Sequence, residues 1–547
     1  MKKLTALILL FPLLAASCRK EEAPTTSQPN PEPAPEPAEI SISISSTGFS
    51  DADASGETVS ITEFSDGDAC GLYILNDGKI TASNIRIVAS DKAGKIAWGP
   101  EDGTALDFEE GQKYFLYYPY QETDSMEDLA AGTADANTTA EDLFAGLVSG
   151  WTPAADQSDP EKFATADLMI AEGVAAPETG GTVPVAFGLT HCMALAVIQK
   201  PQTVYDFEED YLRDYTVSYD PSFTDRTLLE NNGTYLCLVN PVSAQEIEVL
   251  FGVDGKETIN TGNIGAGTYR TFSITETEQC SLTIGDYYCR ADDGKGYIIP
   301  QSAVSAMDND TQVVGVVFYK GRHSKDNLSD YTQPLSAEGT ALGKDVHGYA
   351  VALTDANNGD ADQVKWSSKA ITKPDDADWT LDQGTSTDMT DWNGYYNCCR
   401  INGFVTEYDG TYTMADFPAA FAAANYGNRR VDADGHATED YGWQNRFIAP
   451  SDCSGWFLPS AGQLTEIYNC KDLLAGQIGK INAIITDSSK EYVRWITSIS
   501  RYVWSSTEYG SSPGRNAYAV YFNGGTANWQ NKYGVSNAYA VRPVLAF

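Results

Sequence analysis

The fold of this chain is decided by the stretch WSSTEYGSSPGRNAYAVYFNGGTANWQNKYGVSNAYAVRPVLAF, residues 504–547. Asn, Ser, Gly and Tyr are concentrated in its middle, whereas both of its ends are apolar. Residues 541–547 form a β-rich run, and we predict that this run is buried. A buried frame around small polar and aromatic residues is typical of a binding surface. Tyr supplies rigid contact area there, and Ser, Gly and Asn supply adaptable hydrogen bonds.

Three segments of this stretch, WSSTEY (504–509), NAYAVYFNGG (516–525) and YAVRPVLAF (539–547), resemble one known family. That family consists of C-type-lectin-fold domains diversified by retroelements, in which miscopied template adenines scatter Asn codons over a ligand-binding face. The resemblance implies ligand-binding positions at Tyr509, Gly510, Ser511, Ser512, Asn516, Tyr518, Tyr521, Asn523, Asn528, Tyr533, Ser536, Asn537 and Tyr539.

The residues Trp529, Gln530 and Lys532 cannot arise from an Asn codon that is altered only at its adenines. Trp529 is nevertheless added to the candidate ligand contacts. Domains of the same fold that are not diversified carry similar Asn-rich hairpins, so the sequence leaves active diversification open.

The N-terminal segment resembles a bacterial lipoprotein signal. Two lysines precede an apolar run at residues 4–15, which is too short to span a bilayer as a mature helix. AASC (15–18) follows, although the position three before the cysteine holds Ala15 where Leu is usual. The resemblance implies acylation of Cys18, anchoring in outer-membrane lipid and, from RKEE (19–22), display on the cell surface. The alternative is secretion with Cys18 unmodified.

The next segment is rich in proline. In residues 23–39 the prolines at 31, 33, 35 and 37 alternate with other residues, which favours an extended polyproline II stalk. At a rise of about 3.1 Å per residue, this stalk is roughly 50 Å long. A flexible linker is the alternative interpretation.

Composition limits the classes of function. A length of 547 residues indicates several domains, and a hydrophobic content of 42% is sufficient for folded cores. The 76 acidic residues outnumber the 36 basic ones, which gives a formal net charge of −40. Because such a surface repels phosphate backbones, we expect no nucleic-acid partner.

The cysteines do not define a site. Besides Cys18 there are nine, so at least one thiol is free or bridges to another chain, and no CxxC pair indicates a zinc site. We predict no particular disulfide. Cys453 and Cys470 are considered because a related fold includes a cysteine-dependent oxidase, but a structural role is favoured for both.

Short alternating runs dominate residues 40 to about 275 and predict antiparallel β-sandwiches. YYPY (117–120), DQS (156–158), DLM (167–169) and FGLTH (187–191) resemble, in this order, the first domain of fimbrillin-like proteins. GAGTYRTFSI (265–274) resembles the closing strand of the second domain of that family. His191 lies between apolar residues, and we predict a hydrogen-bonded core histidine.

The second half has a different texture. We predict a helix over residues 417–424 capped by Asp416, and a helix from the capping box SAGQ (460–463) to about Cys470. WFLPS (456–460) and HGYAVAL (347–353) also resemble landmarks of the C-type-lectin fold. The predicted fold is therefore β-rich and multidomain, with two antiparallel fimbrillin-like β-sandwiches followed by an α+β C-type-lectin-fold domain. The predicted boundaries are a signal peptide at 1–17, the lipidated cysteine and stalk at 18–39, a sandwich at 40–200, a smaller sandwich at 201–278 and the lectin-fold domain at 281–547.

No motif indicates catalysis. The string GSSPG (510–514) matches GxSxG, but Pro513 blocks the helix that should follow the nucleophile and no His lies downstream. The acidic turn at 355–362 lacks the Glu that closes an EF-hand, since the twelfth position is Trp366. We therefore expect no enzyme, no cofactor and no metal.

Two functions follow from these features. The first is a cell-surface lipoprotein adhesin or receptor that binds an unknown protein or glycan through residues 504–539. The alternative is a structural or tip subunit of a fimbria, which associates with other fimbrial subunits by strand donation.

Overall fold

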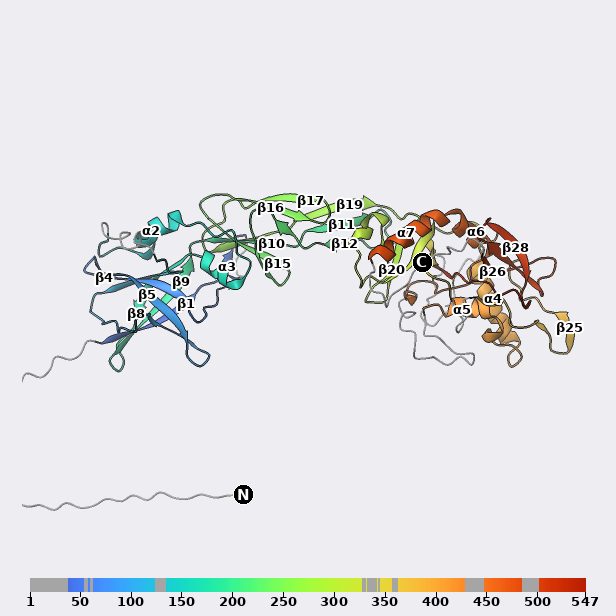
Figure 1. Cartoon of the computed structure of the whole chain (residues 1–547), viewed down its shortest axis with the longest axis horizontal. Coiled ribbons are helices and arrows are strands. Elements are labelled where there is room, and N and C mark those ends of the chain that lie inside the picture. The colour runs from blue at the N-terminus through green and yellow to red at the C-terminus, as the bar shows by residue number, and fades with distance from the viewer. Residues whose placement is uncertain are drawn as a thin grey trace, which may run out of the picture.

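The computed structural model describes residues 38–53, 58–59, 62–122, 134–326, 331, 342, 345–356, 363–427, 447–484 and 501–547. The predictions for the signal peptide, for Cys18 and for most of the stalk lie outside these residues, as does most of the acidic turn at 355–362. Figure 1 shows an elongated molecule in which an N-terminal barrel, a set of middle sheets and a C-terminal α+β part follow one another.

The N-terminal part is a closed seven-stranded barrel. Its strands, in order around the barrel, are β1 (Glu39–Ser46), β6 (Ile96–Pro100), β5 (Lys79–Asp91), β4 (Ala69–Asn76), β7 (Lys113–Tyr118), β8 (Met169–Ala175) and β9 (Thr182–His191). In β9, alternate residues from Val183 to His191 are buried, as the period of a strand requires.

The prediction of an antiparallel β-sandwich is wrong for this part. The 13-residue strand β5 pairs with a β4 whose register shifts at two places, and such bulges increase twist and bend the sheet. The sheet therefore curls until β1 closes it, antiparallel to β6 but parallel to β9. The helices α2 (Ala140–Gly150) and α3 (Pro160–Ala166) lie between β7 and β8 in the chain.

His191 links the end of the barrel to the start of the middle sheets. Its Nδ1 lies 2.7 Å from a carboxylate oxygen of Asp167, and its Nε2 lies 2.5 Å from the carbonyl oxygen of Thr47. The imidazole also stacks on Phe49, with ring centroids 3.7 Å apart. The prediction of a hydrogen-bonded core histidine is confirmed, and burial raises the pKa of its partner Asp167.

The middle part contains a six-stranded sheet and two three-stranded sheets. The six-stranded sheet has the order β14 (Leu229–Asn231), β15 (Thr234–Val239), β10 (Ala194–Gln199), β18 (Thr268–Phe272), β2 (Phe49–Asp51) and β3 (Thr58–Val59). The other two have the orders β12 (Tyr215–Ser218), β11 (Gln202–Phe207), β19 (Thr275–Cys280) and β13 (Ser222–Phe223), β16 (Glu246–Phe251), β17 (Gly255–Asn260).

Strand pairing in the middle part is mixed, and this also departs from the antiparallel prediction. β18 runs parallel to both β10 and β2, and β19 runs parallel to β11. Because β2, β3 and β10 come from residues 40–200, the first 200 residues contribute strands to both the barrel and the middle part. These parallel pairs join segments that lie far apart in the sequence, a property that local alternation does not reveal.

The C-terminal part is built on two sheets. The first has the order β21 (Gly296–Ile299), β20 (Tyr287–Arg290), β22 (Val313–Lys320), β23 (Gly348–Ala352) and β29 (Val544–Ala546). The second has the order β26 (Tyr502–Glu508), β27 (Asn516–Tyr521) and β28 (Thr526–Asn531), and β24 (Thr372–Lys373) with β25 (Asp376–Thr380) forms a separate hairpin. Residues 541–547 are all buried, which confirms the prediction for the VRPVLAF run.

Helices cover the C-terminal sheets. They are η1 (Gln301–Ala306), α4 (Gly394–Glu407), η2 (Met414–Asp416), α5 (Pro418–Ala424), α6 (Ala461–Asn469) and α7 (Lys471–Ile484). None of the helices in the described ranges is long and apolar enough to cross a membrane. The part therefore combines helices and sheets, as predicted.

One of the two predicted helix starts is confirmed. Gln463 N–H donates to the Ser460 hydroxyl at 3.3 Å, and Ser460 N–H donates to the Gln463 side chain at 2.9 Å, so the capping box opens α6. The prediction that Asp416 caps the other helix is wrong. Asp416 instead ends the 3₁₀ turn η2, where its carboxylate accepts from Thr413 N–H, and α5 begins at Pro418.

Candidate ligand-binding face

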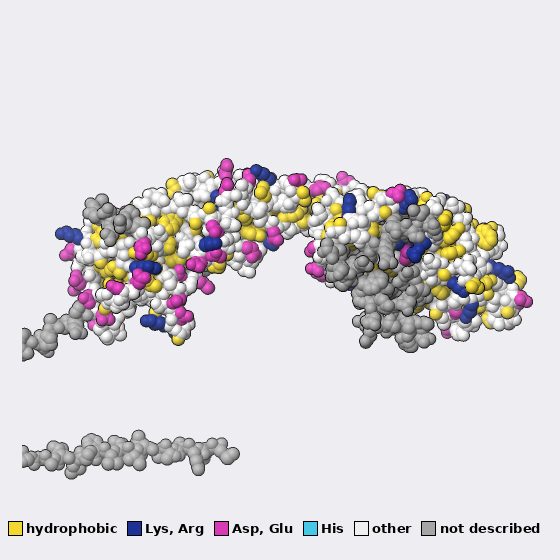
Figure 2. Space-filling model, in the orientation of Figure 1, with side chains coloured by type: hydrophobic (Ala, Val, Ile, Leu, Met, Phe, Trp, Pro, Cys, Tyr) yellow, Lys and Arg dark blue, Asp and Glu magenta, His cyan; other side chains and the backbone are white. Residues whose placement is uncertain are grey.

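None of the fourteen predicted ligand-binding residues is buried. Gly510, Ser511, Asn523, Trp529 and Ser536 are exposed. The other nine are partly exposed: Tyr509, Ser512, Asn516, Tyr518, Tyr521, Asn528, Tyr533, Asn537 and Tyr539. The sheet β26–β27–β28 and its connecting turns carry most of them. In the orientation of Figure 2, hydrophobic side chains gather over the end of the molecule that carries β28.

Strand geometry decides on which side of the sheet each of these side chains lies. Ala517 and Ala519 of β27 are buried, whereas the alternating residues Asn516 and Tyr518 are partly exposed. Tyr518 pairs with Trp529 across the strands, and Ala519 pairs with Asn528. Because side chains alternate along a strand and opposite residues share a side, Asn516, Tyr518 and Trp529 lie on one side of the sheet, and Tyr521 and Asn528 lie on the other side with the buried Ala519.

The aromatic residues form two clusters. In the first, the Tyr509 ring lies 5.6 Å from Tyr518 and 5.7 Å from Trp529, whose side chain is 55% exposed. In the second, Tyr502 contacts Tyr521 and Tyr539 at centroid distances of 4.8 and 5.0 Å. Edge and offset contacts of this kind hold tyrosines in place while their rims stay accessible.

The loops of the face are held by their own polar side chains. The Asn516 amide donates to the Ser512 hydroxyl at 2.6 Å, and the Asn537 amide donates to the carbonyl of Asn531 at 2.9 Å. The Tyr539 hydroxyl donates to the Gln530 side chain at 2.9 Å. Residues 510–515 form a turn, as expected for the GSSPG string.

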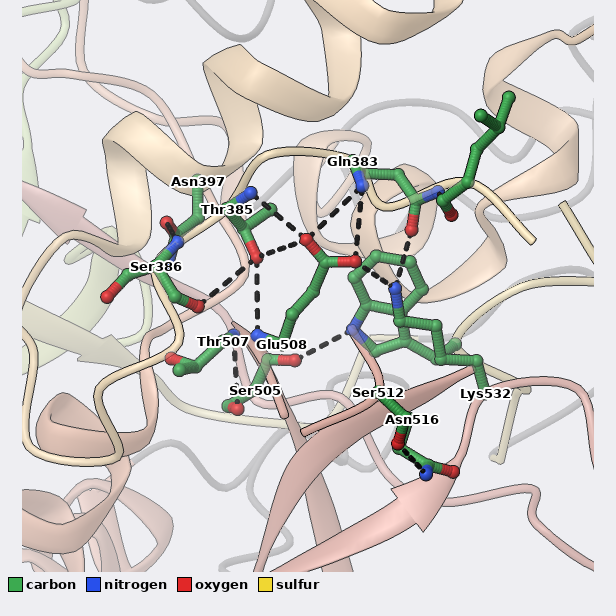
Figure 3. Close-up of polar contacts among 12 residues, drawn as sticks. Gln383, Thr385, Ser386, Asn397, Ser505, Thr507, Glu508, Ser512, Asn516 and Lys532 are labelled. Carbon is green, nitrogen blue, oxygen red and sulfur yellow. Dashed lines mark hydrogen bonds and ion pairs between the residues drawn. The ribbon is translucent and has the colours of Figure 1, made fainter. Parts of the chain in front are cut away.

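Behind the face lies a buried ion pair, shown in Figure 3. The Glu508 carboxylate at the end of β26 pairs with the Lys532 ammonium after β28, and both side chains are fully buried. Glu508 also accepts hydrogen bonds from Gln383 N–H at 3.2 Å and from Thr385 N–H and hydroxyl at 3.1 Å. The ammonium donates to the Gln383 side chain at 2.5 Å and lies 3.9 Å from the Trp366 ring centroid.

This buried network fixes the frame of the face. Burial lowers the pKa of Lys532, and the charge of Glu508 acts in the opposite direction. Removing either partner would leave a buried charge without its counter-ion, which is strongly unfavourable. The pair therefore ties β26, the segment after β28 and the loop at 383–385 into one rigid unit.

A second buried carboxylate supports the WSST segment. Asp391 accepts from the Thr507 hydroxyl at 2.8 Å and from the Asn397 amide at 3.3 Å, and its backbone carbonyl accepts from the Ser460 hydroxyl at 2.7 Å. Burial raises the pKa of Asp391 to about 6. The Trp504 indole donates to the carbonyl of Val364 at 2.8 Å, so this segment is fixed on both sides.

Sequence reasoning missed the residues that support the face. Lys532 stands among the Tyr- and Asn-rich residues but is fully buried. Its partner Gln383, and Thr385 which bonds to Glu508, lie more than 100 residues away in the chain. The only local signal was a charged residue within a stretch of small polar and aromatic ones. That signal does not identify the partners of Lys532.

The thiols show no sign of activation. All nine described cysteines are free. Burial raises the pKa of Cys453 and of Cys470 to about 12, so both thiols are protonated at neutral pH. Among the described residues, no three His, Cys, Asp or Glu side chains converge as metal ligands.

The fold and the face together define a β-rich multidomain protein with a closed barrel at one end and an aromatic, polar face at the other. The chain is 25% identical to a protein of Bacteroides ovatus described as "Putative fimbrium tip subunit Fim1C". The similarity covers 99% of this chain and 98% of that protein. No known family model matches the chain.

Two solved structures are also similar to this chain. A fimbrial protein from Bacteroides ovatus is 21% identical over 94% of this chain and 100% of its own, with a TM-score of 0.37. The fimbrial anchor protein Mfa2 from Porphyromonas gingivalis is 10% identical over 48% of this chain and 95% of its own, with a TM-score of 0.20. The similarity to the tip subunit extends over nearly the whole length of both chains. It favours the fimbrial alternative over the stand-alone adhesin.

Proposed function

We propose that this protein is the tip subunit of a bacterial surface fimbria. In this proposal the N-terminal barrel joins the protein to the next subunit, and the C-terminal part presents the ligand-binding face. Similarity to a fimbrium tip subunit over the whole chain supports the assignment. The observation that carries it is the way in which β1 closes the barrel.

Strand β1 is attached to the barrel on one side far more extensively than on the other. It shares eight register pairs with β9, in parallel, but one with β6, between Ile42 and Trp98. Backbone bonds at residues 38–40 to the loop at 106–108 complete that side. Parallel pairing is slightly less stable per residue than antiparallel pairing, so a strand that replaces β1 would have to displace mainly this parallel ladder.

A groove lies beside β1. This cavity of about 450 Å³ is lined by the β1 residues Ile42 and Ile44 together with Phe64, Ile96 and Trp98. Side chains of β1 at alternate positions, Ile40, Ile42 and Ile44, pack against the barrel core. A donated strand with the same alternation could replace β1 and bury the same surface, which is the basis of recognition by strand addition.

Strand β29 is unsuited to being donated in return. It pairs with β23, bridges to Phe457 and is completely buried in the C-terminal core. Withdrawing it would expose that core. A subunit that accepts a strand through its barrel and retains its own β29 fits the end of a fibre. Figure 1 places the barrel and β28 at opposite ends of the molecule, so the face would point away from the shaft.

The test is to locate the protein on cells of the source strain by immunogold electron microscopy. We expect gold particles at the free ends of fibrils and co-purification with shaft subunits. Labelling along the whole length of the fibrils would contradict the tip position.

The stand-alone lipoprotein adhesin is the second candidate, and the AASC sequence at residues 15–18 favours it. It places the protein in the outer membrane through acylated Cys18, with residues 23–39 as the stalk and the same face as the binding site. Uniform gold labelling of the cell surface without fibrils, together with incorporation of labelled palmitate that a Cys18→Ala variant abolishes, would select this candidate.

The C-terminal part from residue 281 is further proposed to have a C-type-lectin-like fold. Two helices, α4 and α6, together with the β26–β28 sheet and the return of β29 to the first sheet support this assignment. Its fourteen face residues would be the ligand contacts.

Whether the face is diversified is tested by deep sequencing of codons 495–547 in a population of the source strain. Substitutions confined to adenine positions, together with a near-identical downstream repeat, are the expected result. An invariant tract without a repeat would overturn diversification and leave the binding face unaffected.

A further inference from the structure

We propose a second binding site, for a saccharide, in the cavity between the β24–β25 hairpin and helix α4. The proposal deepens the ligand-binding half of the proposed function, because it names a ligand class for the same end of the molecule. The saccharide site does not depend on how the barrel joins a fimbria. None of the fourteen face residues lines this cavity.

The cavity has the size and accessibility of a site for a small ligand. Its volume is about 330 Å³, near the lower end of the range of roughly 300–1,000 Å³ for ligand pockets. Trp379 on β25 is 60% exposed, and the Lys373 ammonium lies 5.3 Å from the centroid of its ring. Figure 1 shows β25 protruding near β28 at the far end of the molecule from the barrel.

The lining combines a flat aromatic ring with charged groups. Arg400, Glu407 and Tyr408 come from α4 and the residue after it, and Asp382 comes from the segment after β25. The side chains of Arg400, Glu407 and Asp382 are all exposed. Their donors and acceptors therefore remain available to a ligand.

The walls of the cavity are fixed before any ligand enters. The Tyr412 hydroxyl donates to the carbonyl of Thr372 at 2.6 Å, which fastens the hairpin that carries Trp379. Gly384 has a φ of +68°, and a Cβ atom there would lie 2.7 Å from the Arg400 guanidinium, so glycine makes room for this arginine. The neighbouring Gln383 is bound to Glu508 and Lys532.

The chemistry of the lining selects a saccharide. A pyranose has one apolar C–H face that can lie on an indole and a rim of hydroxyls that both donate and accept. Arg400 supplies donors, and Asp382 and Glu407 supply acceptors, as paired hydroxyls require. Two carboxylates against one guanidinium disfavour a phosphate or another anion. The charged lining is equally unsuited to an apolar ligand.

The experiment uses the chain from residue 19 to 547, which retains every described element. Saturation-transfer NMR against a panel of neutral hexoses, N-acetylhexosamines and their oligosaccharides identifies a ligand, and calorimetry then measures its affinity. We expect Trp379→Ala and Arg400→Ala each to weaken binding at least tenfold. Since Trp379 is largely exposed, its variant should keep the wild-type circular dichroism and thermal transition.

Tyr211→Ala is the control, since this exposed aromatic residue lies outside the cavity and outside the predicted face. We expect it to change saccharide affinity less than twofold. No binding to any member of the panel at millimolar concentration would overturn the saccharide site. So would unchanged affinity in Trp379→Ala, or loss of binding in Tyr211→Ala alone. The immunogold result does not depend on these outcomes, so a failure here is distinguishable from a failure of the fimbrial assignment.

Discussion

The Glu508 carboxylate and the Lys532 ammonium form an ion pair in which neither side chain is exposed to solvent. Glu508 is the last residue of β26, and Lys532 directly follows β28. The loop at 383–385 forms hydrogen bonds to both side chains. The tyrosines and asparagines on the surface therefore rest on a buried electrostatic support. Substitutions on the accessible side leave that support intact, so a face built in this way tolerates changes in its contact residues.

Lys532→Met should destabilise the C-terminal part by about 3–5 kcal/mol, because it leaves the buried Glu508 carboxylate without its counter-ion. Differential scanning calorimetry of the chain from residue 19 would measure the effect. Adding Glu508→Gln to Lys532→Met should recover part of the loss. Lys471→Met, which removes an exposed ion pair with Asp472, is the control and should leave the transition unchanged. Equal effects of the Lys471 and Lys532 variants would contradict the support role.

Asp391→Asn should flatten the dependence of stability on pH between about 4 and 6. Burial raises the pKa of Asp391 to about 6, above its ordinary value, so the folded protein binds the proton more tightly than the unfolded chain. The stability that protonated Asp391 contributes is fully present below the pKa of this group in the unfolded chain. It is lost as the pH rises through the pKa of the group in the folded protein. A shift of about two pKa units corresponds to about 3 kcal/mol.

The readout for Asp391 is the slope of unfolding free energy against pH, compared between wild type and variant. The titration of Asp391 changes this slope, whereas the loss of hydrogen bonds in the variant lowers the unfolding free energy by the same amount at every pH. An identical slope in the two proteins would show that Asp391 does not titrate in this range.

A disulfide between β1 and β9 should block incorporation into fibrils. Ser43 and Ala186 are register partners in this parallel pair, and both are exposed. Neighbouring strands lie at a Cα separation that a disulfide can bridge. Fibrils from cells that express Ser43→Cys with Ala186→Cys should contain at least tenfold less of the protein.

The reductant dithiothreitol should restore incorporation of the locked protein, and Ser43→Cys alone should behave as wild type. Normal incorporation of the oxidised double variant, with the disulfide verified by mass spectrometry, would mean that β1 stays in place during assembly. Strand exchange at β1 would then be excluded.

Ser460→Ala should weaken the start of helix α6 by about 1–2 kcal/mol, because the hydroxyl accepts from Gln463 N–H and also donates to the Asp391 carbonyl. Hydrogen exchange at residues 461–464 should accelerate. Ser149→Ala is the control: this hydroxyl lies at the exposed end of α2 and donates to the Gly146 carbonyl. The variant should change neither the unfolding free energy nor the hydrogen exchange at residues 461–464. Unchanged exchange in Ser460→Ala would show that the cap does not limit opening of this turn.

Local chemistry was sufficient to predict several elements. The SAGQ box predicted the start of α6, because both of its hydrogen bonds form within four residues. The apolar VRPVLAF run predicted a buried segment, and the outward positions of the Tyr- and Asn-rich stretch followed from its polarity. Asp416 failed as a cap because Thr413 lies within reach of its carboxylate and a 3₁₀ turn forms first.

The sequence by itself determined that residues 40 to about 275 are rich in short strands, which residues of the final stretch stay accessible, and that His191 lies in a core. These properties depend on neighbours in the chain and on the balance of apolar and polar side chains. Only the tertiary structure decided that β1 closes a barrel in parallel with β9, that β2 leaves the barrel to join β18, and that Gln383 and Thr385 meet Glu508 and Lys532. Those contacts join residues more than 100 positions apart, and no local pattern specifies which distant partner a strand or a buried charge will find.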